Sequence, residues 1–516
     1  MGRAGTLKPF KNTKRYRGPA LDKDLDKIAY VEGAADSLGR RLVAPGLALV
    51  FMAFCGFAAS YQLDFLTNSN AIILFFAAVI GAYMALNIGA NDVANNVGPA
   101  VGAKAVSLKT ALVLAVVFEC AGALLAGDKV LDTVATDILP LASGLEPELF
   151  MTAMMSALIA SAVWIHIATY IGAPVSTTHS VIGGIVGAGI AAAGWSALSW
   201  PVIGAIIASW VFSPLLGALV AAAFLWFINA MIVDRENKLA AARFWLPILI
   251  GGMIFAFSAF FFIKALDRIL VVHWALAFLI SALLGGIAWM VSGPLIVRQT
   301  FGLENRTQSL KKLFVWPLMG AASVLSFAHG ANDVANAVGP VAAIVEVQRA
   351  QTAVFDPWVL AESGAKMPIW VSAIGAFGIS LGLLLFGPRL IRVVGQRITK
   401  LNPIRAFCVS LSAAVTVLLA TSFGLPVSST YIAVGAIFGV GFYREWRRDK
   451  KRSAGSHFRG LVSGGRGVRN KEAHQRRLLV RRSYLLTIVG AWIVTVPIAA
   501  ALAALTYRVI LIFVEI

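Results

Sequence analysis

The stretch GANDVANNVGP, residues 89–99, occurs a second time in this chain as GANDVANAVGP, residues 330–340. Ten of the eleven positions are identical, and only Asn96 differs from its counterpart Ala337. Chance does not produce so long a match at a distance of 241 residues within one chain. The sequence therefore predicts a duplicated fold.

A second pair of motifs follows the first pair in the same order. The first half carries GAPVSTT at residues 172–178, and the second half carries GLPVSST at residues 424–430. The offset is now 252 residues, so the two halves differ by eleven residues of loop. Two different motifs in one repeated order predict two structural repeats, an arrangement typical of secondary transporters.

The composition places these repeats in a membrane. Of 516 residues, 59% are hydrophobic and 13% are charged, and the mean hydropathy is +0.81. Soluble domains carry about 25% charged residues, and a single soluble core could not hide so much apolar surface. We therefore expect an all-α polytopic membrane protein with about 12 transmembrane helices in two repeats.

Several apolar runs are long enough, or nearly long enough, to cross a bilayer. They are residues 42–62, 70–90, 110–127, 149–171, 174–193, 201–230, 244–264, 270–292, 313–331, 367–387, 404–423, 426–442 and 485–505. Some runs are short and interrupted by Gly or Pro. We expect these to form broken or re-entrant helices near the midplane, so the exact number of spans stays open.

The motifs and runs divide the chain into seven parts. In order, we expect a cytoplasmic N-terminal segment (1–41), an additional span and loop (42–69), a first transport repeat (70–230), connecting spans and loops (231–312), a second transport repeat (313–442), a basic cytoplasmic loop (443–484) and a final span (485–516).

Basic residues outnumber acidic ones, and the net charge is +19. They concentrate in residues 1–41, 389–405 and 444–482, which lack the interleaved aromatics and the fold of a nucleic-acid-binding surface. We expect no nucleic acid as partner and place these segments on the cytoplasmic side. The stretch 443–484 is either a solvated loop or a patch for lipid headgroups or regulation.

Equivalent loops of the two halves carry opposite charge. The loop 128–148, one span after the first GANDVAN motif, has five acids and one Lys. The loop 388–405, one span after the second motif, has five Lys or Arg and no acid. Because Lys and Arg favour the cytoplasmic side, the two repeats are predicted to have inverted topology, with the N-terminus in the cytoplasm.

Asp92 and Asp333 lie in long apolar stretches, where a carboxylate is costly unless it is paired or lines a polar cavity. Carboxylate and amide oxygens suit a hard cation, and no Lys or Arg lies within either motif. We therefore expect cation sites, occupied by Na⁺ if the protein is sodium-coupled. The alternative is that these side chains only hydrogen-bond between packed helices. The candidate ligands are Asn91, Asp92, Asn95, Asn332, Asp333 and Asn336.

The PVS motifs suit an anion. Proline favours the first position of a helix, so the hydroxyls that follow would lie in its first turn. A helix N-terminus offers free N–H groups and a partial positive charge, which bind an anion without Arg or Lys. The alternative is ordinary helix capping. The candidate anion ligands are Ser176, Thr177, Thr178, Ser428, Ser429 and Thr430.

Glu119 also lies inside a predicted span, after the first motif. An intramembrane carboxylate indicates function by default, here as a coupling carboxylate, although a packing hydrogen bond is the alternative. His166, His179 and His329 lie in apolar surroundings too, and for these we expect structural or supporting roles.

The doubled GANDVAN and PVS motifs resemble the inorganic phosphate transporter (PiT) family over residues 70 to 510. The resemblance implies a symporter of phosphate with Na⁺ or H⁺, whose Asp/Asn motifs line the cation sites and whose Ser/Thr motifs hold phosphate. It implies no cofactor beyond the co-transported ion. Well-known eukaryotic members match Glu119 but carry a second glutamate in the other half, where this chain has Ser410. The coupling ion and stoichiometry therefore stay open.

The alternatives to phosphate transport are sulfate transport, enzymatic activity and a simple pore. A sulfate permease on the same fold is the nearest alternative, because sulfate is also tetrahedral. Enzymatic activity is not expected, because the sequence shows no nucleophile–base set, no metal-ligand cluster and no soluble catalytic domain. Broken helices in inverted repeats argue against a simple pore. We expect a bacterial inner-membrane protein in contact with membrane lipids and leave a homodimer open.

Overall fold

The computed structural model describes residues 42–61, 69–140, 144–171, 175–266, 270–355, 368–397, 401–460 and 482–514. The predicted N-terminal segment 1–41 and much of the basic loop 443–484 lie outside these ranges. The chain divides into two units, Met1–Leu49 and Val50–Ile516, and the second contains the body described below.

Every regular element in the described ranges is a helix. After a first helix, Leu42–Tyr61, these are α2 (Ser69–Asn91), α3 (Val93–Gly102), α4 (Leu108–Ala126), α5 (Asp128–Asp132), α6 (Pro147–Ile171), α7 (Thr177–Ala193), α8 (Trp200–Ile228), α9 (Lys238–Phe260), α10 (Trp274–Thr300), α11 (Thr307–Leu313), α12 (Val315–Phe355), α14 (Ile369–Arg397), α15 (Pro403–Ser422), α16 (Ser429–Gly460) and α18 (Arg482–Val514), with short π- or 3₁₀-helical turns between some of them.

Within the described residues, ten helices are long and apolar enough to cross a membrane. The bent pair α11 and α12, with an angle of 46° between them, adds an eleventh. This agrees with an all-α polytopic membrane protein. The count falls slightly below the expected dozen because α7 has only 17 residues and the second half of α16 is strongly charged.

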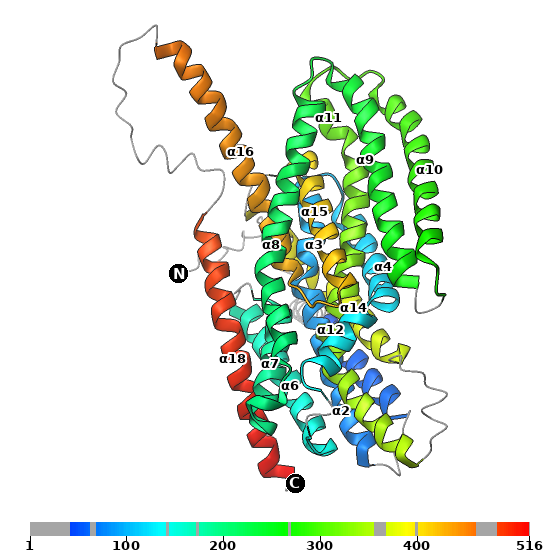
Figure 1. Ribbon diagram of the computed structural model, residues 1–516, viewed down its shortest axis with the longest axis vertical. Helices are drawn as coiled ribbons and strands as arrows, with labels where there is room; N and C mark the ends of the chain where they lie inside the picture. The colour runs from blue at the N-terminus through cyan, green and yellow to red at the C-terminus, as the bar shows by residue number, and fades with distance from the viewer. Residues whose placement is uncertain are drawn as a thin grey trace, which may run out of the picture. The chain divides into compact units, whose positions relative to one another are not determined.

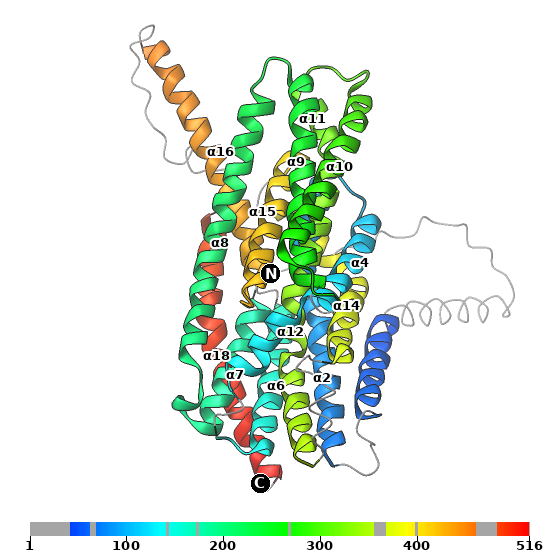
Figure 2. The ribbon, with the colours of Figure 1, turned by 45° about the vertical axis from the view of Figure 1, so that its right-hand side comes forward.

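The two halves repeat the same order of helices. The pair α2–α3 corresponds to α12, α4 to α14, and the hairpin α6–α7 to α15–α16. Each half packs on the other, because α2 packs on α14 while α12 packs on α4. Likewise α8 packs on α15 and α16, and α18 packs on α6 and α7. The helices α2 and α12 run in opposite directions (Figures 1 and 2), as inverted repeats require.

Glycines allow the backbones of the two halves to touch. A Cβ atom on Gly330 of α12 would lie 2.1 Å from the carbonyl oxygen of Glu119 on α4. At the corresponding Gly89 of α2, a Cβ would lie 1.9 Å from the carbonyl oxygen of Ile379 on α14. Small residues at helix crossings permit this close packing in membranes, where no hydrophobic effect drives helices together. These two crossings therefore fix the positions of both GANDVAN motifs.

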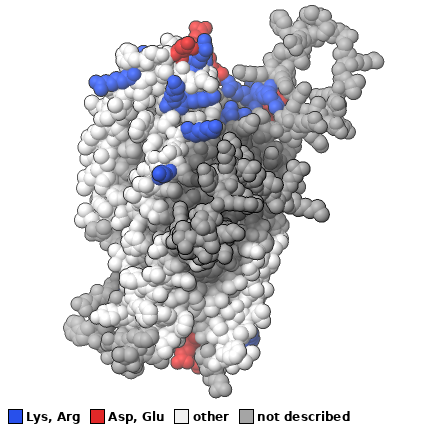
Figure 3. All heavy atoms as spheres, turned by 180° about the vertical axis from the view of Figure 1, so that it is seen from behind, with Lys and Arg blue, Asp and Glu red and all other residues white. Residues whose placement is uncertain are grey.

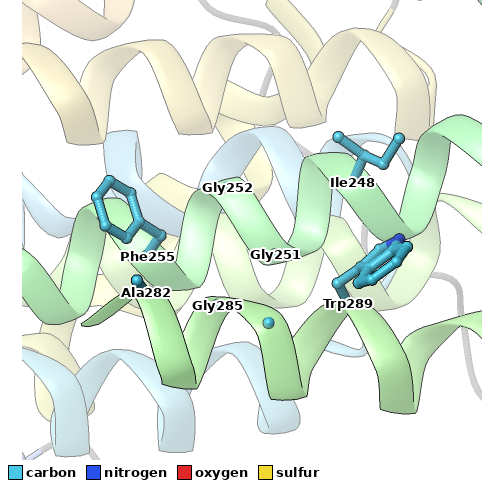
Figure 4. A pocket seen from close by; sticks show the side chains of 8 residues that line it. Ile248, Gly251, Gly252, Phe255, Ala282, Gly285 and Trp289 are labelled. Atoms are coloured by element: carbon cyan, nitrogen blue, oxygen red, sulfur yellow. The ribbon is translucent and has the colours of Figure 1, made fainter. Parts of the chain in front are cut away.

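The helices α9 and α10 form a hairpin from the connecting region. The two helices cross at Gly251 and Gly285. Residues of both helices, among them Phe255 and Trp289, line an apolar hollow of about 300 Å³ at this crossing (Figure 4). Large apolar side chains such as Leu279 and Met290 are 67% and 69% exposed on α10. Exposed apolar helices of this length are suited to contact with lipid tails.

Replacing Gly330 with Val should destabilise the protein, because α4 and α12 would have to separate. Overpacking of this kind costs about 1–3 kcal/mol, which we expect to lower the Tm of the purified protein in detergent. Gly286→Val on α10 is the matched control, because nothing lies within 4 Å of a Cβ atom there. An equal loss of Tm in both variants would contradict the close crossing.

Candidate functional site

Asp92 and Asp333 are both buried, with 2% and 1% exposure. Asp92 stands at the junction between α2 and α3, whereas Asp333 lies inside the continuous helix α12. In the second motif, Pro340 is accommodated within α12. The Gly and Pro residues of this motif therefore do not unwind the helix. The backbone instead leaves helical geometry between α15 and α16, from Phe423 to Ser428.

The helices α7 and α16 begin at the two PVS motifs. The Oγ of Ser176 accepts a hydrogen bond of 3.3 Å from the backbone N–H of His179 and caps α7. The Oγ of Ser428 accepts the equivalent bond of 3.4 Å from the N–H of Tyr431 at the start of α16. The capping interpretation is thus confirmed for the first hydroxyl of each motif. Residues 172–174 of the first motif lie outside the described ranges.

The second hydroxyl of each motif reaches the aspartate of its own half. The Oγ1 of Thr177 donates to Asp92 Oδ2 at 2.8 Å, and the Oγ of Ser429 lies 3.2 Å from Asp333 Oδ2 as a donor. These hydroxyls are buried, so each carboxylate meets a helix N-terminus away from water. Hydrogen bonds to an ionised acceptor are about twice as strong as neutral ones.

The third hydroxyl of each motif reaches the asparagine of the opposite half. The Nδ2 of Asn95 donates to Thr430 Oγ1 at 2.8 Å, and the Nδ2 of Asn336 donates to Thr178 Oγ1 at 2.9 Å. Thr430 in turn donates to Asp92 Oδ1 at 3.0 Å. Thr178, its counterpart, donates to the carbonyl oxygen of Val427 at 3.1 Å. The two repeats therefore exchange Asn–Thr contacts at one centre, but only Thr430 also reaches an aspartate.

Asn332 holds the non-helical segment before α16. Its Oδ1 accepts from the N–H of Val427 at 3.1 Å, and its Nδ2 donates to the carbonyl oxygen of Leu425 at 3.0 Å. Both bonds replace backbone partners that the segment lacks as it leaves helical geometry. The counterpart of Asn332 in the first half is Asn91, which is half-buried. In the first half, only Val175 is described of the segment that would correspond to Leu425–Val427.

Unpaired acceptors remain at this centre. Asp333 Oδ1 and Asn336 Oδ1 are buried, and neither has a hydrogen-bond partner among the described residues. Oxygen or nitrogen atoms of Asp92, His329 and Asp333 lie within 4.8 Å of one another. Buried acceptor oxygens of this kind fit a hard cation, which could satisfy several of them at once.

Glu119 and His329 extend the centre on one side. His329 Nε2 lies 2.9 Å from Asp333 Oδ2, and His329 Nδ1 lies 3.3 Å from Glu119 Oε1. Asn96 Nδ2 donates to the same Glu119 oxygen at 2.8 Å. A histidine thus bridges two buried carboxyl groups. His329 and Asp333 are four residues apart on α12 and so lie on one face of that helix.

The remaining predicted residues lie elsewhere. His179 stacks on Trp210 with ring centres 3.9 Å apart, and the hydroxyl of Tyr83 is 2.7 Å from His166 Nδ1. Both histidines thus pack against aromatic side chains outside the carboxylate centre. Ser410 is fully buried on α15, and its hydroxyl has no hydrogen-bond partner among the described residues. Since α15 corresponds to α6, Ser410 is not the repeat counterpart of Glu119.

The comparison with known families agrees with this arrangement. The model of the phosphate transporter family matches residues 88–503, which include both GANDVAN motifs and both PVS motifs. The chain belongs to the phosphate transporter family. The match covers both repeats, so the duplicated architecture is a property of the family domain.

Individual relatives extend the similarity. A Helicobacter pylori (strain J99) protein with the name of a phosphate permease is 40% identical over 94% of this chain and 98% of its own length. A Thermococcus kodakarensis protein of similar name is 33% identical over 85% of this chain and 98% of its own length. A solved sodium-dependent phosphate transporter superposes with a TM-score of 0.72 at 33% identity, covering 86% of this chain and 100% of the other.

In this phosphate transporter fold, the symmetry between the two repeats is broken at Glu119 and His329. Gly330 packs on Glu119, and the corresponding Gly89 packs on Ile379. Glu119 and Ile379 therefore occupy corresponding places at the two helix crossings. The GANDVAN repeat aligns His329 with Ile88. The crossing of α4 and α12 thus carries a buried Glu–His pair, whereas the crossing of α2 and α14 carries two isoleucines at the corresponding places.

The single mismatch in the motif follows the same pattern. Asn96 donates a hydrogen bond to Glu119. Its counterpart is Ala337, and the counterpart of Glu119 is Ile379, which cannot accept a hydrogen bond through its side chain. Sequence reasoning found Glu119 but missed its connection to Asp333 through His329. The mismatch between Asn96 and Ala337 was the available signal, because it marks the position that touches Glu119.

Replacing Thr430 with Val should destabilise the protein by about 1–3 kcal/mol, because Asp92 and Asn95 would both lose a buried partner. Thermal unfolding of the purified protein would measure the loss. Thr506→Val is a suitable control, because the hydroxyl of Thr506 bonds only the carbonyl oxygen of Leu502 on its own helix. If both variants unfold at the same temperature, the crossed contacts do not contribute to stability.

Proposed function

We propose that this member of the phosphate transporter family is a secondary active transporter that carries inorganic phosphate across the membrane together with Na⁺ or H⁺, by alternating access. The observation that carries the proposal is the meeting of two buried aspartates with two helix N-termini. Carboxylates attract a cation, and helix N-termini attract an anion. The family match and the sodium-dependent structural relative support phosphate as the anion and Na⁺ as the first cation to test.

The hydroxyl groups supply a physical link between the two ions. Thr177 and Ser429 each have one proton to donate, and both now donate it to a carboxylate. A cation bound to Asp92 or Asp333 would neutralise that carboxylate and release the hydroxyl to turn towards an anion. Cation binding would thereby create donors for phosphate. In this proposal Asn91, Asn95, Asn332 and Asn336 complete the cation sites, and Ser176, Thr178, Ser428 and Thr430 complete the anion site.

Glu119 takes the role of a coupling carboxylate that acts through His329. Its oxygen contacts His329, which contacts Asp333, so any change at Glu119 is transmitted to the second aspartate. Of the two corresponding helix crossings, only that of α4 and α12 contains this couple among the described residues. We therefore propose that the two cation sites are not equivalent.

Phosphate is favoured over sulfate by the acceptors at the centre. At neutral pH phosphate carries protons that it can donate, whereas sulfate carries none. Two buried acceptors, Asp333 Oδ1 and Asn336 Oδ1, have no partner among the described residues, and one that the cation leaves free could receive such a proton. Sulfate has no proton to offer it.

The charge distribution supports the expected orientation. Figure 3 shows Lys and Arg gathered at one end of the molecule, in the region of α11 and the charged half of α16. By the positive-inside rule this end faces the cytoplasm. We propose a multi-pass protein of the bacterial inner membrane with a cytoplasmic N-terminus.

Uptake of labelled phosphate into proteoliposomes tests the transport proposal. We expect saturable uptake that is driven by a Na⁺ gradient or a pH gradient, resists excess sulfate and is abolished in Asp333→Asn. Uptake of sulfate in place of phosphate would retain the carrier and change its substrate. Folded protein that moves neither anion under either gradient would refute transport.

The hydroxyl link predicts the behaviour of Thr177→Val. Loss of one hydrogen bond to a charged group should raise the KM for phosphate about tenfold or more, and the coupling cation should lower this KM less than in the wild type. Ser180→Ala is the matched control, because its hydroxyl bonds only the carbonyl oxygen of Ser176 within α7. A Thr177→Val protein whose KM responds to the cation as the wild type does would contradict the link.

A further inference from the structure

The non-helical segment Leu425–Val427 leads into α16, and most of its backbone groups are bonded from other elements. The N–H of Leu425 bonds the carbonyl oxygen of Ala420, and Pro426 has no N–H. Four polar groups remain, namely the three carbonyl oxygens and the N–H of Val427. Inside a membrane, water does not satisfy such groups. The segment therefore keeps its conformation only if other parts of the protein supply the partners.

Three side chains bond all four groups. Asn332 bonds the first carbonyl oxygen of the segment and the N–H of Val427. The Oγ1 of Thr178 donates to the carbonyl oxygen of Val427 at 3.1 Å. The indole Nε1 of Trp210, on α8, donates to the carbonyl oxygen of Pro426 at 3.0 Å. Asn332 and Thr178 belong to the repeated motifs, so Trp210 is the partner that lies outside these motifs.

Trp210 also contacts the helix that begins at the first PVS motif. Its ring centre lies 3.9 Å from that of His179 in the first turn of α7, and the two side chains are 7% and 2% exposed. The ring of His179 lies 5.3 Å from that of Tyr431 in the first turn of α16. The backbone N–H groups of His179 and Tyr431 are those that the first hydroxyls of the motifs cap. One side chain on α8 thus contacts both parts of the proposed anion site.

Glycine crossings fix the register between α8 and its counterpart α18. A Cβ atom on Gly435 of α16 would lie 2.3 Å from the carbonyl oxygen of Pro214 on α8. At the corresponding Gly183 of α7, a Cβ atom would lie 2.8 Å from the carbonyl oxygen of Val496 on α18. Pro214 and Val496 therefore occupy corresponding positions, 282 residues apart in the chain.

This register gives Trp210 a counterpart of the same residue type. Trp210 stands four residues before Pro214, and Trp492 stands four residues before Val496. Burial of apolar surface alone would be served by any large apolar residue at this repeat position. A tryptophan in both halves indicates a role for the indole, which combines a large ring with an N–H donor.

We propose that Trp210 is a positioning residue for the phosphate site, which holds the start of α16 against the start of α7 so that both helix N-termini face one anion. The inference rests on the transport function proposed above. The indole N–H fixes the segment before α16, and the ring packs on the first turn of α7. Without Trp210 the carbonyl oxygen of Pro426 would lose its donor. The helix starts would then be held less precisely, and phosphate affinity would fall.

Uptake of labelled phosphate by proteoliposomes that contain Trp210→Phe tests the role of the N–H. Phe retains an aromatic ring beside His179 and removes the donor. We expect the KM for phosphate to rise about three- to tenfold, with kcat changed by less than about twofold. A purely structural role would instead lower the amount of folded protein, and thus the maximal rate, and leave KM unchanged.

Trp200→Phe is the matched control on the same helix. The Nε1 of Trp200 donates to the carbonyl oxygen of Trp195 at 2.9 Å, so the variant loses a bond of the same kind. Trp200 lies at the start of α8, about 15 Å along the helix from Trp210. Its KM for phosphate should equal that of the wild type.

Hydrogen–deuterium exchange, measured by mass spectrometry without phosphate, reports on the segment itself. Amides of residues 424–431 should exchange about three- to tenfold faster in Trp210→Phe than in the wild type, because the segment opens more often when one of its bonds is lost. Peptides from α9 should exchange alike in both proteins.

His179→Leu is a second variant, which keeps the indole N–H and removes the ring on which Trp210 packs. It also serves if Trp210→Phe does not fold, and its KM for phosphate should rise about two- to fivefold. If the wild type takes up phosphate and the folded variants match it in KM and in exchange, Trp210 is not a positioning residue and the transport function stands. A wild type that moves no phosphate would refute the transport function and this inference together.

Discussion

The structure depends on the burial of two carboxylates inside an apolar helical bundle. Asp92 and Asp333 are each almost fully buried, and a charge there is tolerated only if polar groups surround it. The protein supplies them as hydroxyls at the N-termini of α7 and α16. This requirement explains why α7 and α16 begin at the PVS motifs, because these two helices must begin where the aspartates lie.

Much of the fold and of the candidate site could be predicted from the sequence, because each motif occurs twice in the same order. The two motifs fixed the repeats, and their residue types indicated which would attract cations and which anions. The loop charges of residues 128–148 and 388–405 predicted the inverted arrangement. Family membership then agreed with the resemblance that the motifs had suggested.

Other features could not be predicted from one chain. No spacing rule shows that Thr430 of one half bonds Asn95 of the other, because that contact joins residues 335 positions apart. Proline and glycine would allow both GANDVAN segments to unwind, yet only the first is interrupted, at Asp92, and α12 stays helical through Asp333. The helix α12 packs against α4 and α14. In the second half the backbone leaves helical geometry before α16 instead.

The pairing of Glu119 and His329 at one of two corresponding helix crossings has a thermodynamic consequence. If the two repeats of a carrier that works by alternating access were identical, exchanging their conformations would convert the inward-facing state into an outward-facing state of the same free energy. In this protein the crossing of α4 and α12 holds the Glu–His pair, whereas the crossing of α2 and α14 holds Ile88 and Ile379 at the same places. The exchange would therefore not restore the same contacts. Under the function that we propose, the empty protein would prefer one side of the membrane because of two side chains that need not touch the substrate.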